Sequence, residues 1–390
     1  MKKRWIGLCT VLILLAGVCA SGPLPSGAAP ADPVNVDGVC GLTVTPAVLP
    51  RGAQAPVDYW NDMQKAQIVV DLYKVADAEK VPGYDTYAFN PESGYDGLGD
   101  ISDYTMLQGM TADEWEREAY KAAKIALEKG TPQKSEDLQE SGTKLDDLDP
   151  GLYLVIAHGK DLAPDKYRKT LKEALTTGLG ETEITQESEW LVTIANTDRY
   201  EYAFAPYLIA LPTKPVNEEG ESTTDNPGPW IYDREIFLKG DRDQRYGNLE
   251  IIKTLQNYEE VEGTIEPVTF VFHVTAVLDD ETVYDEVESL TFSGDAGTDR
   301  VTMTGIPATA QVTVREEYTG ISYTQVVPAN NGTASNTIVA DDLVSVNFEN
   351  VYNNNRTHGH GIKNRFVYNE AENEWEWHPD PEQTVGEEGE

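Results

Sequence analysis

Alternating polar and apolar residues in the second half of this 390-residue chain predict β-strands, and three of these strands carry a polar residue on their apolar face. Side chains two positions apart on a strand point to the same side of a sheet. This spacing places Lys253 of LEIIKTL, Glu316 of VTVREEY and Asn350 of VSVNFENVY among apolar neighbours, whereas Glu317 faces the other way. The neighbours expected on the face of Glu316 are Val312, Val314 and Tyr318. Burying a lone charge is costly, so we expect the three side chains to satisfy one another or to take part in chemistry.

Residues 247–353 are predicted to form one Greek-key β-sandwich. Turn signals recur about every 10 to 15 residues, as expected for such a fold. They separate strand candidates near residues 249, 268, 287, 299, 310, 322, 334 and 343.

Residues 57–213 are predicted to form a first β domain with an inserted helical segment. Its strand signals lie at Gln67 to Val75, Gly151 to Ala157, Trp190 to Asn196 and Tyr202 to Pro212. Thr111 and Glu114 make a capping-box pattern before a helix that Gly130 ends, and a shorter helix is expected over 165–175. Strands and helices do not alternate regularly, so the pattern favours a mainly β fold of tandem immunoglobulin-like sandwiches over an α/β sheet.

The remaining segments have distinct compositions. Residues 1–31 carry three basic residues and then an apolar run, the pattern of an export signal that is cleaved. Residues 32–56 are expected to be a spacer or a loosely attached first strand, and 214–246 a linker with a bridging strand. Residues 354–390 form an acidic tail. No second apolar run of about 18 residues follows the signal, so we expect no transmembrane segment after cleavage and a secreted or cell-surface protein.

The charge and the cysteine content narrow the function classes. The formal net charge of −37 becomes −40 once the three basic residues of the signal are removed, which disfavours nucleic acid as a partner. Of three cysteines, only Cys40 lies clearly beyond the signal, so no intrachain disulfide framework is expected despite export. The folded domains therefore need another source of stability.

The three polar residues suggest what that source is. If Lys253 and Asn350 lie on adjacent first and last strands, burial favours a neutral lysine amine that attacks the asparagine carboxamide. A protonated Glu316 would polarise the amide carbonyl and shuttle protons while ammonia leaves. This chemistry needs no cofactor and no metal, and it occurs once per molecule, so we expect no turnover enzyme.

Residues 247–353 resemble the isopeptide-containing, Cna-B-like immunoglobulin-like domains of Gram-positive pilin backbones and surface adhesins. The matching segments are GNLEIIKTL, TFVFHVTA, GIPATAQVTVREEY and VNFENVYNN. The resemblance implies that Lys253 forms the bond, that Glu316 is the proton-shuttling acid and that Asn350 is the bonded asparagine. It also implies a pilin-like or adhesin-like subunit whose partners are other surface subunits, a sortase, or a host or matrix ligand.

The first domain resembles pilin modules through VDLYKVA, LDPGLYLV and FAPYLIALPTK. Lys74 and Asn196 are candidates there for a second cross-link, although no acid can be placed beside them and an ion pair with an aspartate is an alternative for Lys74. Lys239 lies roughly where a polymerising pilin lysine would sit, without the Tyr-Pro-Lys-Asn context. The chain ends without an LPxTG-like signal, so self-anchoring by sortase is not expected.

A second class of function remains open, a secreted carbohydrate-binding or carbohydrate-active protein that uses the sandwiches as a stalk. Such an enzyme needs a pair of carboxylates in a cleft, and no spacing in the sequence points to one. Trp375 and Trp377 could contact a sugar, but alternate aromatics more often pack on a domain face. His358, His360 and His378 lack further placed ligands for zinc.

Overall fold

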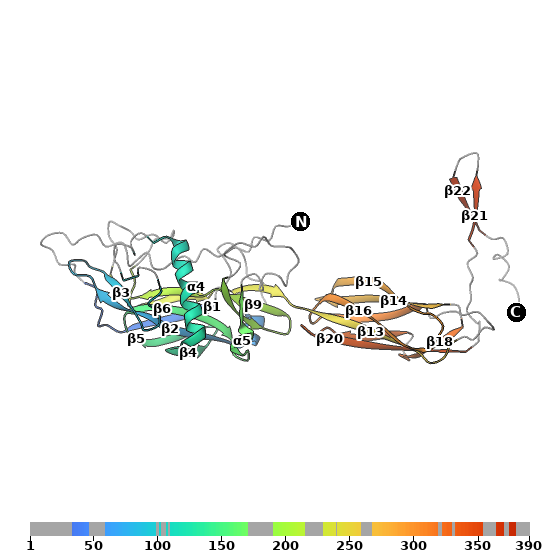
Figure 1. Ribbon diagram of the computed structural model, residues 1–390, viewed down its shortest axis with the longest axis horizontal. Coiled ribbons are helices and arrows are strands. Elements are labelled where there is room, and N and C mark those ends of the chain that lie inside the picture. Colours follow the sequence, from blue (N-terminus) through green and yellow to red (C-terminus); the bar gives the residue numbers. More distant parts are fainter. Residues whose placement is uncertain are drawn as a thin grey trace. The chain divides into compact units, whose positions relative to one another are not determined.

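The computed structural model describes most of the chain between residues 33 and 379. The described segments are residues 33–46, 59–98, 101–102, 107, 110–170, 190–214, 229–238, 240–258, 267–318, 322–329, 332–353, 364–369 and 374–379. They divide into two compact units, the first ending at Tyr246 and the second beginning at Gly247. Strands dominate both units (Figure 1), so the expected mainly β fold class is confirmed.

The described residues of the first unit form three sheets and two cores. Its strands are β1 (Cys40–Pro46), β2 (Ile68–Lys80), β3 (Tyr87–Pro91), β4 (Lys134–Asp137), β5 (Thr143–Leu148), β6 (Gly151–Gly159), β7 (Arg168–Thr170), β8 (Leu191–Asn196), β9 (Tyr200–Phe204), β10 (Tyr207–Leu211), β11 (Asp233–Leu238) and β12 (Gly240–Gln244). The strand orders are β11-β1-β5, β10-β6-β2-β3 with β4 also paired to β2, and β12-β9-β8-β7.

Strand β6 contributes to both cores of this unit. Leu154 belongs to the core that includes Trp115 of helix α4 (Ala112–Lys129), and Tyr153 belongs to the core that includes Leu42 of β1. Both faces of the strand are therefore buried, which explains why its sequence is an unbroken apolar run and not an alternating one.

Helix α4 begins and ends where the sequence predicts. The Thr111 hydroxyl accepts from the backbone N–H of Glu114, and the Glu114 carboxylate accepts from the backbone N–H of Thr111 at 2.7 Å, which completes the capping box. The Gly130 N–H donates to the carbonyl of Ala126 at the other end. The helix crosses the sheet that contains β6 (Figure 1), and its apolar stripe faces the core.

Of the second predicted helix, over 165–175, the described part is helical only at its start. Only a short helix, α5 (Pro164–Tyr167), forms, and the chain then enters β7, which pairs antiparallel with β8. Residues 171–175 lie outside the described residues. Pairing with an adjacent strand has overridden the helical pattern of this segment, a common outcome for short amphipathic stretches.

Strand β1 lies within the stretch expected to be a spacer or a loosely attached first strand. It is the central strand of its sheet, between β5 and the parallel strand β11, and Leu42 and Val44 are fully buried. The alternation of its apolar residues gives one face to the core. The expected bridging strand is β11, which pairs within the first unit.

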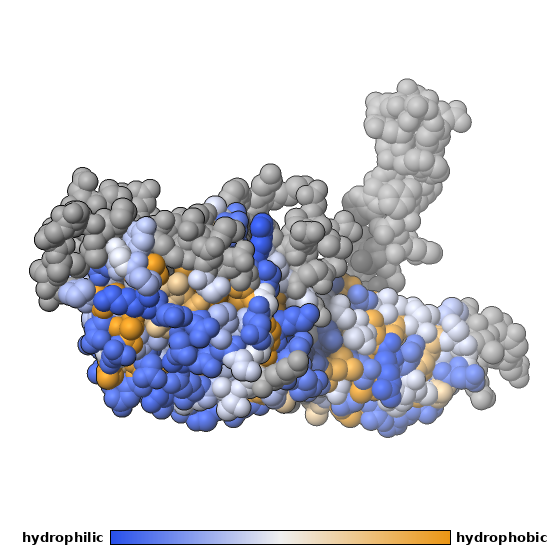
Figure 2. Space-filling model, turned by 60° about the vertical axis from the view of Figure 1, so that its left-hand side comes forward, coloured by the Kyte–Doolittle hydropathy of each residue, from blue (hydrophilic) through white to orange (hydrophobic). Residues whose placement is uncertain are grey.

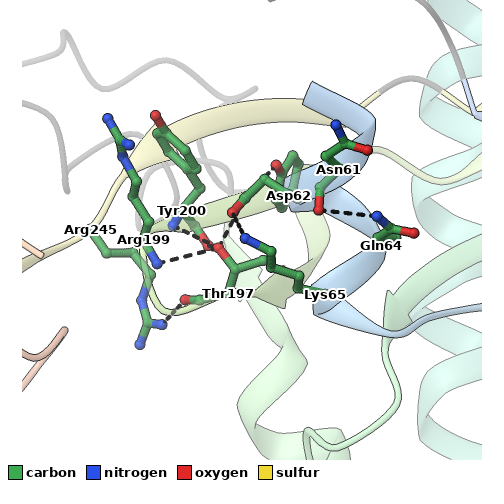
Figure 3. Close-up of polar contacts among 9 residues, drawn as sticks. Asn61, Asp62, Gln64, Lys65, Thr197, Arg199, Tyr200 and Arg245 are labelled. Carbon is green, nitrogen blue, oxygen red and sulfur yellow. Dashed lines mark hydrogen bonds and ion pairs between the residues drawn. The ribbon is translucent and has the colours of Figure 1, made fainter. Parts of the chain in front are cut away.

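A buried polar network ties the short helix α2 (Tyr59–Met63), which leads into the 3-10 turn η1 (Gln64–Ala66), to the turn between β8 and β9 (Figure 3). The Asp62 carboxylate accepts from the hydroxyls of Thr197 at 3.0 Å and Tyr202 at 2.8 Å. The same Thr197 hydroxyl accepts the backbone N–H of Tyr200 at 2.9 Å. These bonds satisfy a carboxylate that is 7% exposed.

Two four-stranded sheets form the sandwich of the second unit. The strands are β13 (Tyr246–Leu255), β14 (Val268–Leu278), β15 (Glu281–Phe292), β16 (Gly297–Pro307), β17 (Gln311–Tyr318), β18 (Tyr323–Val327), β19 (Thr333–Thr337) and β20 (Leu343–Tyr352). Their orders are β16-β13-β20-β18 and β15-β14-β17-β19. The eight strands match the eight strand signals of the sequence, and β13 pairs parallel with β20.

Beyond the sandwich, β21 (Asn364–Asn369) and β22 (Glu374–Pro379) pair as a separate antiparallel hairpin. The predicted export signal lies outside the described residues. In the part of the chain that the structure describes, no helix is long and apolar enough to cross a membrane.

Hydrophilic residues cover most of the described surface that Figure 2 shows. This agrees with the excess of 67 acidic over 30 basic residues. Large apolar side chains at the surface are scattered, with Phe237 of β11 and Val287 of β15 among the most exposed. Single exposed apolar side chains are ordinary in soluble domains.

Candidate functional site

Lys253, Glu316 and Asn350 meet inside the second unit. Lys253 lies on β13 and Asn350 on the adjacent β20, while Glu316 reaches them from β17 of the facing sheet. The Lys253 Nζ donates to Oε1 of Glu316 at 2.5 Å, and the Asn350 Nδ2 donates to the same oxygen at 3.0 Å. Three residues that are far apart in sequence therefore share one hydrogen-bonded cluster.

The cluster is closed to solvent. Lys253 and Asn350 are 0% exposed, and so is the side chain of Glu316. The lysine Nζ lies 4.2 Å from the ring centroid of Phe270 and 5.8 Å from that of Phe272. Aromatic rings thus take the place of water around the amine, so the site excludes water from a lysine that could react.

Burial moves both titratable groups toward their neutral forms. It lowers the pKa of Lys253 to about 8, although the charge and hydrogen bond of Glu316 act in the opposite direction. Burial likewise raises the pKa of Glu316, with Lys253 and Asn350 acting against the rise. A neutral amine is a nucleophile and a protonated carboxyl is a general acid, so the site combines the two forms that amide exchange needs.

Two polar atoms of the cluster are left without a hydrogen bond among the described residues. These are Oε2 of Glu316 and Oδ1 of Asn350. An unsatisfied buried acceptor is costly, so its presence calls for an explanation. A proton on Oε1 of Glu316 and a half-turn of the Asn350 amide would let the carboxyl donate to Oδ1, because the Asn350 amide contacts Oε1 at 3.0 Å. The arrangement therefore accommodates a protonated acid that polarises the amide carbonyl.

Strand β17 presents Glu316 to the core through an irregular register. Phe272 of β14 pairs with Glu316, but the preceding Val271 pairs with Tyr318, so one residue of β17 is passed over. This bulge turns Tyr318 outward, where it is 48% exposed, and the expectation that it shares the face of Glu316 is wrong. Glu317 lies on the exposed side, as expected, and binds Arg315.

The structure does not bring Lys74 and Asn196 together. Lys74 lies beside Gly151 at one end of β6. At the other end, Gly159 lies against Ala195, the residue before Asn196. Eight residues of a strand span about 26 Å. Lys74 instead forms ion pairs with Asp77 and, at 3.7 Å, with Asp149. Lys239 lies outside the described residues.

A second buried lysine, which the sequence analysis missed, lies in the first unit. Lys214 is 3% exposed, and its Nζ donates to Oδ2 of Asp85 at 3.0 Å. Oδ1 of Asp85 also accepts the backbone N–H of Val34 at 2.8 Å and the indole N–H of Trp230 at 3.2 Å. Burial alone would raise the pKa of Asp85, but the three donors outweigh it and hold that pKa below its ordinary value.

The sequence pattern gave no signal for this cluster. Lys214 lies beyond Leu211, where β10 ends, so the alternation of the strand does not reach it. Asp85 gave no signal either, because it lies in the loop between β2 and β3, where no strand phase applies.

The first unit also has an open cavity of about 1040 Å³, lined in part by β2, β4, β6 and α5. On its lining, the Asp71 carboxylate accepts from the Ser135 hydroxyl at 2.6 Å and contacts Nε2 of His158 at 3.2 Å. Nδ1 of His158 contacts the carbonyl of Gly159 at 3.0 Å. Both ring nitrogens thus face acceptors, an arrangement that favours the doubly protonated imidazolium.

Comparison with known proteins gives matches of limited extent. The model of a domain of unknown function, DUF5979, matches residues 249–353, the part of the chain that holds the buried cluster. No curated protein matches the chain.

The solved structures to which the chain is similar include Gram-positive pilins and adhesins. The minor pilin GBS52 of Streptococcus agalactiae is 12% identical, with 80% of this chain and 96% of that chain covered and a TM-score of 0.18. A streptococcal ancillary pilin is 12% identical, with 81% and 69% covered and a TM-score of 0.22. A Mobiluncus mulieris adhesin with disulfide, isopeptide and ester cross-links is 15% identical, with 73% and 84% covered and a TM-score of 0.24. At these identities and TM-scores the matches carry no argument about individual residues.

Proposed function

We propose that this chain is a structural subunit of a bacterial cell surface, pilin-like or adhesin-like, whose second unit is locked by an amide bond between Lys253 and Asn350. The observation that carries the proposal is the solvent-free cluster in which Lys253, Glu316 and Asn350 lie within hydrogen-bonding distance, with both titratable groups shifted toward neutrality. The chemistry of these side chains supports the bond, whereas the surface role is suggested by the pilins and adhesins to which the chain is similar.

The reaction balances with these three groups alone. The neutral Nζ of Lys253 attacks Cγ of Asn350 while protonated Glu316 donates to Oδ1. Glu316 then carries a proton from the attacking nitrogen to Nδ2, and when the carbonyl re-forms the proton on Oδ1 returns to Glu316. The Nζ–Cγ bond forms, the Cγ–Nδ2 bond breaks, and Nδ2 leaves as ammonia. Nothing is oxidised or reduced, and no cofactor or metal takes part.

The bond would strengthen the second unit in two ways. It closes a loop of about 100 residues, which by the chain-entropy model stabilises the folded state by about 4 to 5 kcal/mol. It also joins β13 and β20, the first and last strands of the sandwich, which lie side by side and parallel. A pulling force that enters at one strand and leaves at the other would pass through the bond, and the strands between them would carry no load.

The wider role follows from this stability. A secreted subunit without a disulfide framework gains a cross-link that reducing agents cannot break, as a protein exposed outside the cell requires. Its partners in this proposal are other surface subunits, a sortase that acts on the chain, and a host or matrix ligand. No observation on the described residues specifically supports the alternative of a carbohydrate-active protein on a stalk.

The mass of the intact folded chain tests the proposal. We expect a deficit of about 17 Da, the mass of the ammonia lost in amide formation. Glu316→Ala should restore the full mass because the proton shuttle is gone. Glu317→Ala, an acid next in sequence but on the exposed side, is the matched control and should keep the deficit. A full mass in the unmodified chain would disprove the bond.

A further inference from the structure

Beyond the end of β13, a side chain continues the pairing with β20. The last residue pair of the two strands joins Leu255 to Asn350. The N–H of Gln256 then donates to the backbone carbonyl of Asn350 at 3.0 Å. After that, the Asn257 side chain takes over: its Oδ1 accepts the N–H of Tyr352 at 2.7 Å, and its Nδ2 donates to the carbonyl of Tyr352 at 3.3 Å.

One carboxamide therefore binds both backbone groups of Tyr352. Only a group that combines a donor and an acceptor can do this, and among side chains of this size the asparagine amide has both. The Asn257 side chain thus stands in for a strand partner at the point where the backbone of β13 has ended. This contact lies two residues beyond Asn350, at the same end of β20.

The position of this contact matters because Asn350 is the last residue of β20 that pairs with β13, although β20 stays paired with β18 on its other edge as far as Tyr352. Along the β13 edge the backbone pairing ends here, where local opening is easiest, and a one-residue slip against β13 would turn the Asn350 side chain to the other face of the sheet. Amide formation requires Nζ and Cγ to be held near van der Waals contact, and small displacements of reacting groups slow reactions strongly. The contacts of Gln256 and Asn257 with β20 hold Asn350 in register opposite Leu255, so that its side chain stays near Lys253.

We propose that Asn257 is a positioning residue for the Lys253–Asn350 bond, acting through the backbone of β20 and not by contact with the reacting atoms. This inference rests on the proposed function. It assigns to an exposed residue outside the buried cluster a role in the rate of cross-linking, separate from the chemistry that Glu316 supplies.

Two variants and one control separate this role from others. Asn257→Ala removes both hydrogen bonds to Tyr352. Asn257→Asp keeps the size and the acceptor but loses the donor, and it places a carboxylate against the Tyr352 carbonyl. Gln256→Ala is the matched control, because the Gln256 side chain binds Glu349 on the same strand while its backbone N–H, which binds Asn350, is retained.

The experiment follows bond formation in the full chain. Protein made in a purified translation mixture is quenched in acid at set times, and intact mass gives the fraction that has lost ammonia. We expect Asn257→Ala and Asn257→Asp to react about tenfold more slowly than the unmodified chain, since two hydrogen bonds of ordinary strength hold the register. Gln256→Ala should stay within about twofold, because it leaves the backbone anchor intact.

Two further readouts exclude a merely structural role. The pH dependence of the rate should keep its shape in the Asn257 variants, because Lys253 and Glu316 are untouched. In a Glu316→Ala background, where no bond forms, Asn257→Ala should raise hydrogen exchange at the Tyr352 amide without unfolding the unit. If Asn257→Ala does not fold in the Glu316→Ala background, the rate of bond formation in Asn257→Asp tests the positioning role.

The possible failures are distinguishable. Equal rates in the unmodified chain and both Asn257 variants, or equal slowing by Gln256→Ala, would overturn the positioning role while leaving the proposed bond intact. A full mass in the unmodified chain would overturn the bond itself, and the positioning role with it.

Discussion

Among the described residues, each unit buries one lysine almost completely, and the surroundings of the two lysines differ. In the first unit, Lys214 meets Asp85, whose carboxylate accepts hydrogen bonds at both oxygens. In the second unit, Lys253 meets Glu316, whose Oε1 accepts two hydrogen bonds while Oε2 has no partner among the described residues. Aromatic rings lie near both amines.

This difference sets the charge of each acid. The donors around Asp85 include a backbone N–H and an indole N–H, which add to the lysine and hold the pKa of the carboxyl below its ordinary value. Glu316 has fewer donors and deeper burial, and its pKa is raised. A buried lysine is therefore held in a stable ion pair where the acid is well solvated by the protein, and is poised for reaction where the acid is not.

The largest expected effect is on the stability of the second unit. Glu316→Ala should lower its free energy of unfolding by about 4 to 5 kcal/mol, because the loop between Lys253 and Asn350 is no longer closed. Guanidinium unfolding measured against Glu317→Ala checks this. If the two variants unfold at the same denaturant concentration, the cross-link adds nothing to stability and the contrast between the two lysines is lost.

The first unit should respond to the loss of its lysine in a different way. Lys214→Met should destabilise it by about 3 to 5 kcal/mol, because the Asp85 charge is left buried without its cation. Urea unfolding of the first unit measures the effect, and intact mass should be the same as expected from the sequence change. An additional mass gain of about 17 or 18 Da would show that Lys214 had itself been cross-linked, contrary to the ion pair.

Acid should sharpen this contrast. The pKa of Asp85 is lowered in the folded state. Its contribution to the stability of the first unit is therefore present above the unfolded aspartate pKa of about 3.9 and is lost as pH falls through the folded value. The amide bond of the second unit has no such dependence. The Lys214→Met variant should therefore lose less stability than the unmodified first unit on acidification.

The smallest expected effect concerns His158. Burial lowers its pKa, but the hydrogen bonds to Asp71 and to the Gly159 carbonyl outweigh burial and raise it. Because the pKa of His158 is raised in the folded state, its protonation stabilises the first unit fully below the unfolded histidine pKa of about 6.5. This stabilisation is lost as pH rises through the folded pKa. Unfolding of the first unit between pH 5 and 8 should show the decline, and His158→Gln should remove it. His273→Gln, in the second unit, is the control and should leave the decline unchanged.

Much of the second unit was predictable because its strands alternate. Face counting placed Lys253, Glu316 and Asn350 toward the core and Glu317 away from it, and the structure has them so. The face predicted for Tyr318 was wrong, because a bulge inserts one residue into the pairing of β17 with β14. A bulge depends on the partner strand, and no period of a single strand reveals it.

The first unit was less predictable because its key contacts join loops. Asp85 and Lys214 are 129 residues apart, and Asp85 lies on no strand. The segment after Tyr167 has a helical pattern, yet it pairs as β7 with β8. In both places, local preference is weak and the partner from a distant segment decides the outcome.

The sequence by itself determined the mainly β class, the capped helix α4 and the faces that carry Lys253, Glu316 and Asn350, because each of these depends on spacing along one segment. Only the tertiary structure decided that the three side chains meet, that Asn257 extends the pairing of β20, and that Lys214 pairs with Asp85 and not with a reactive amide. Such outcomes depend on which distant groups share a buried site and on how many donors each acid receives there.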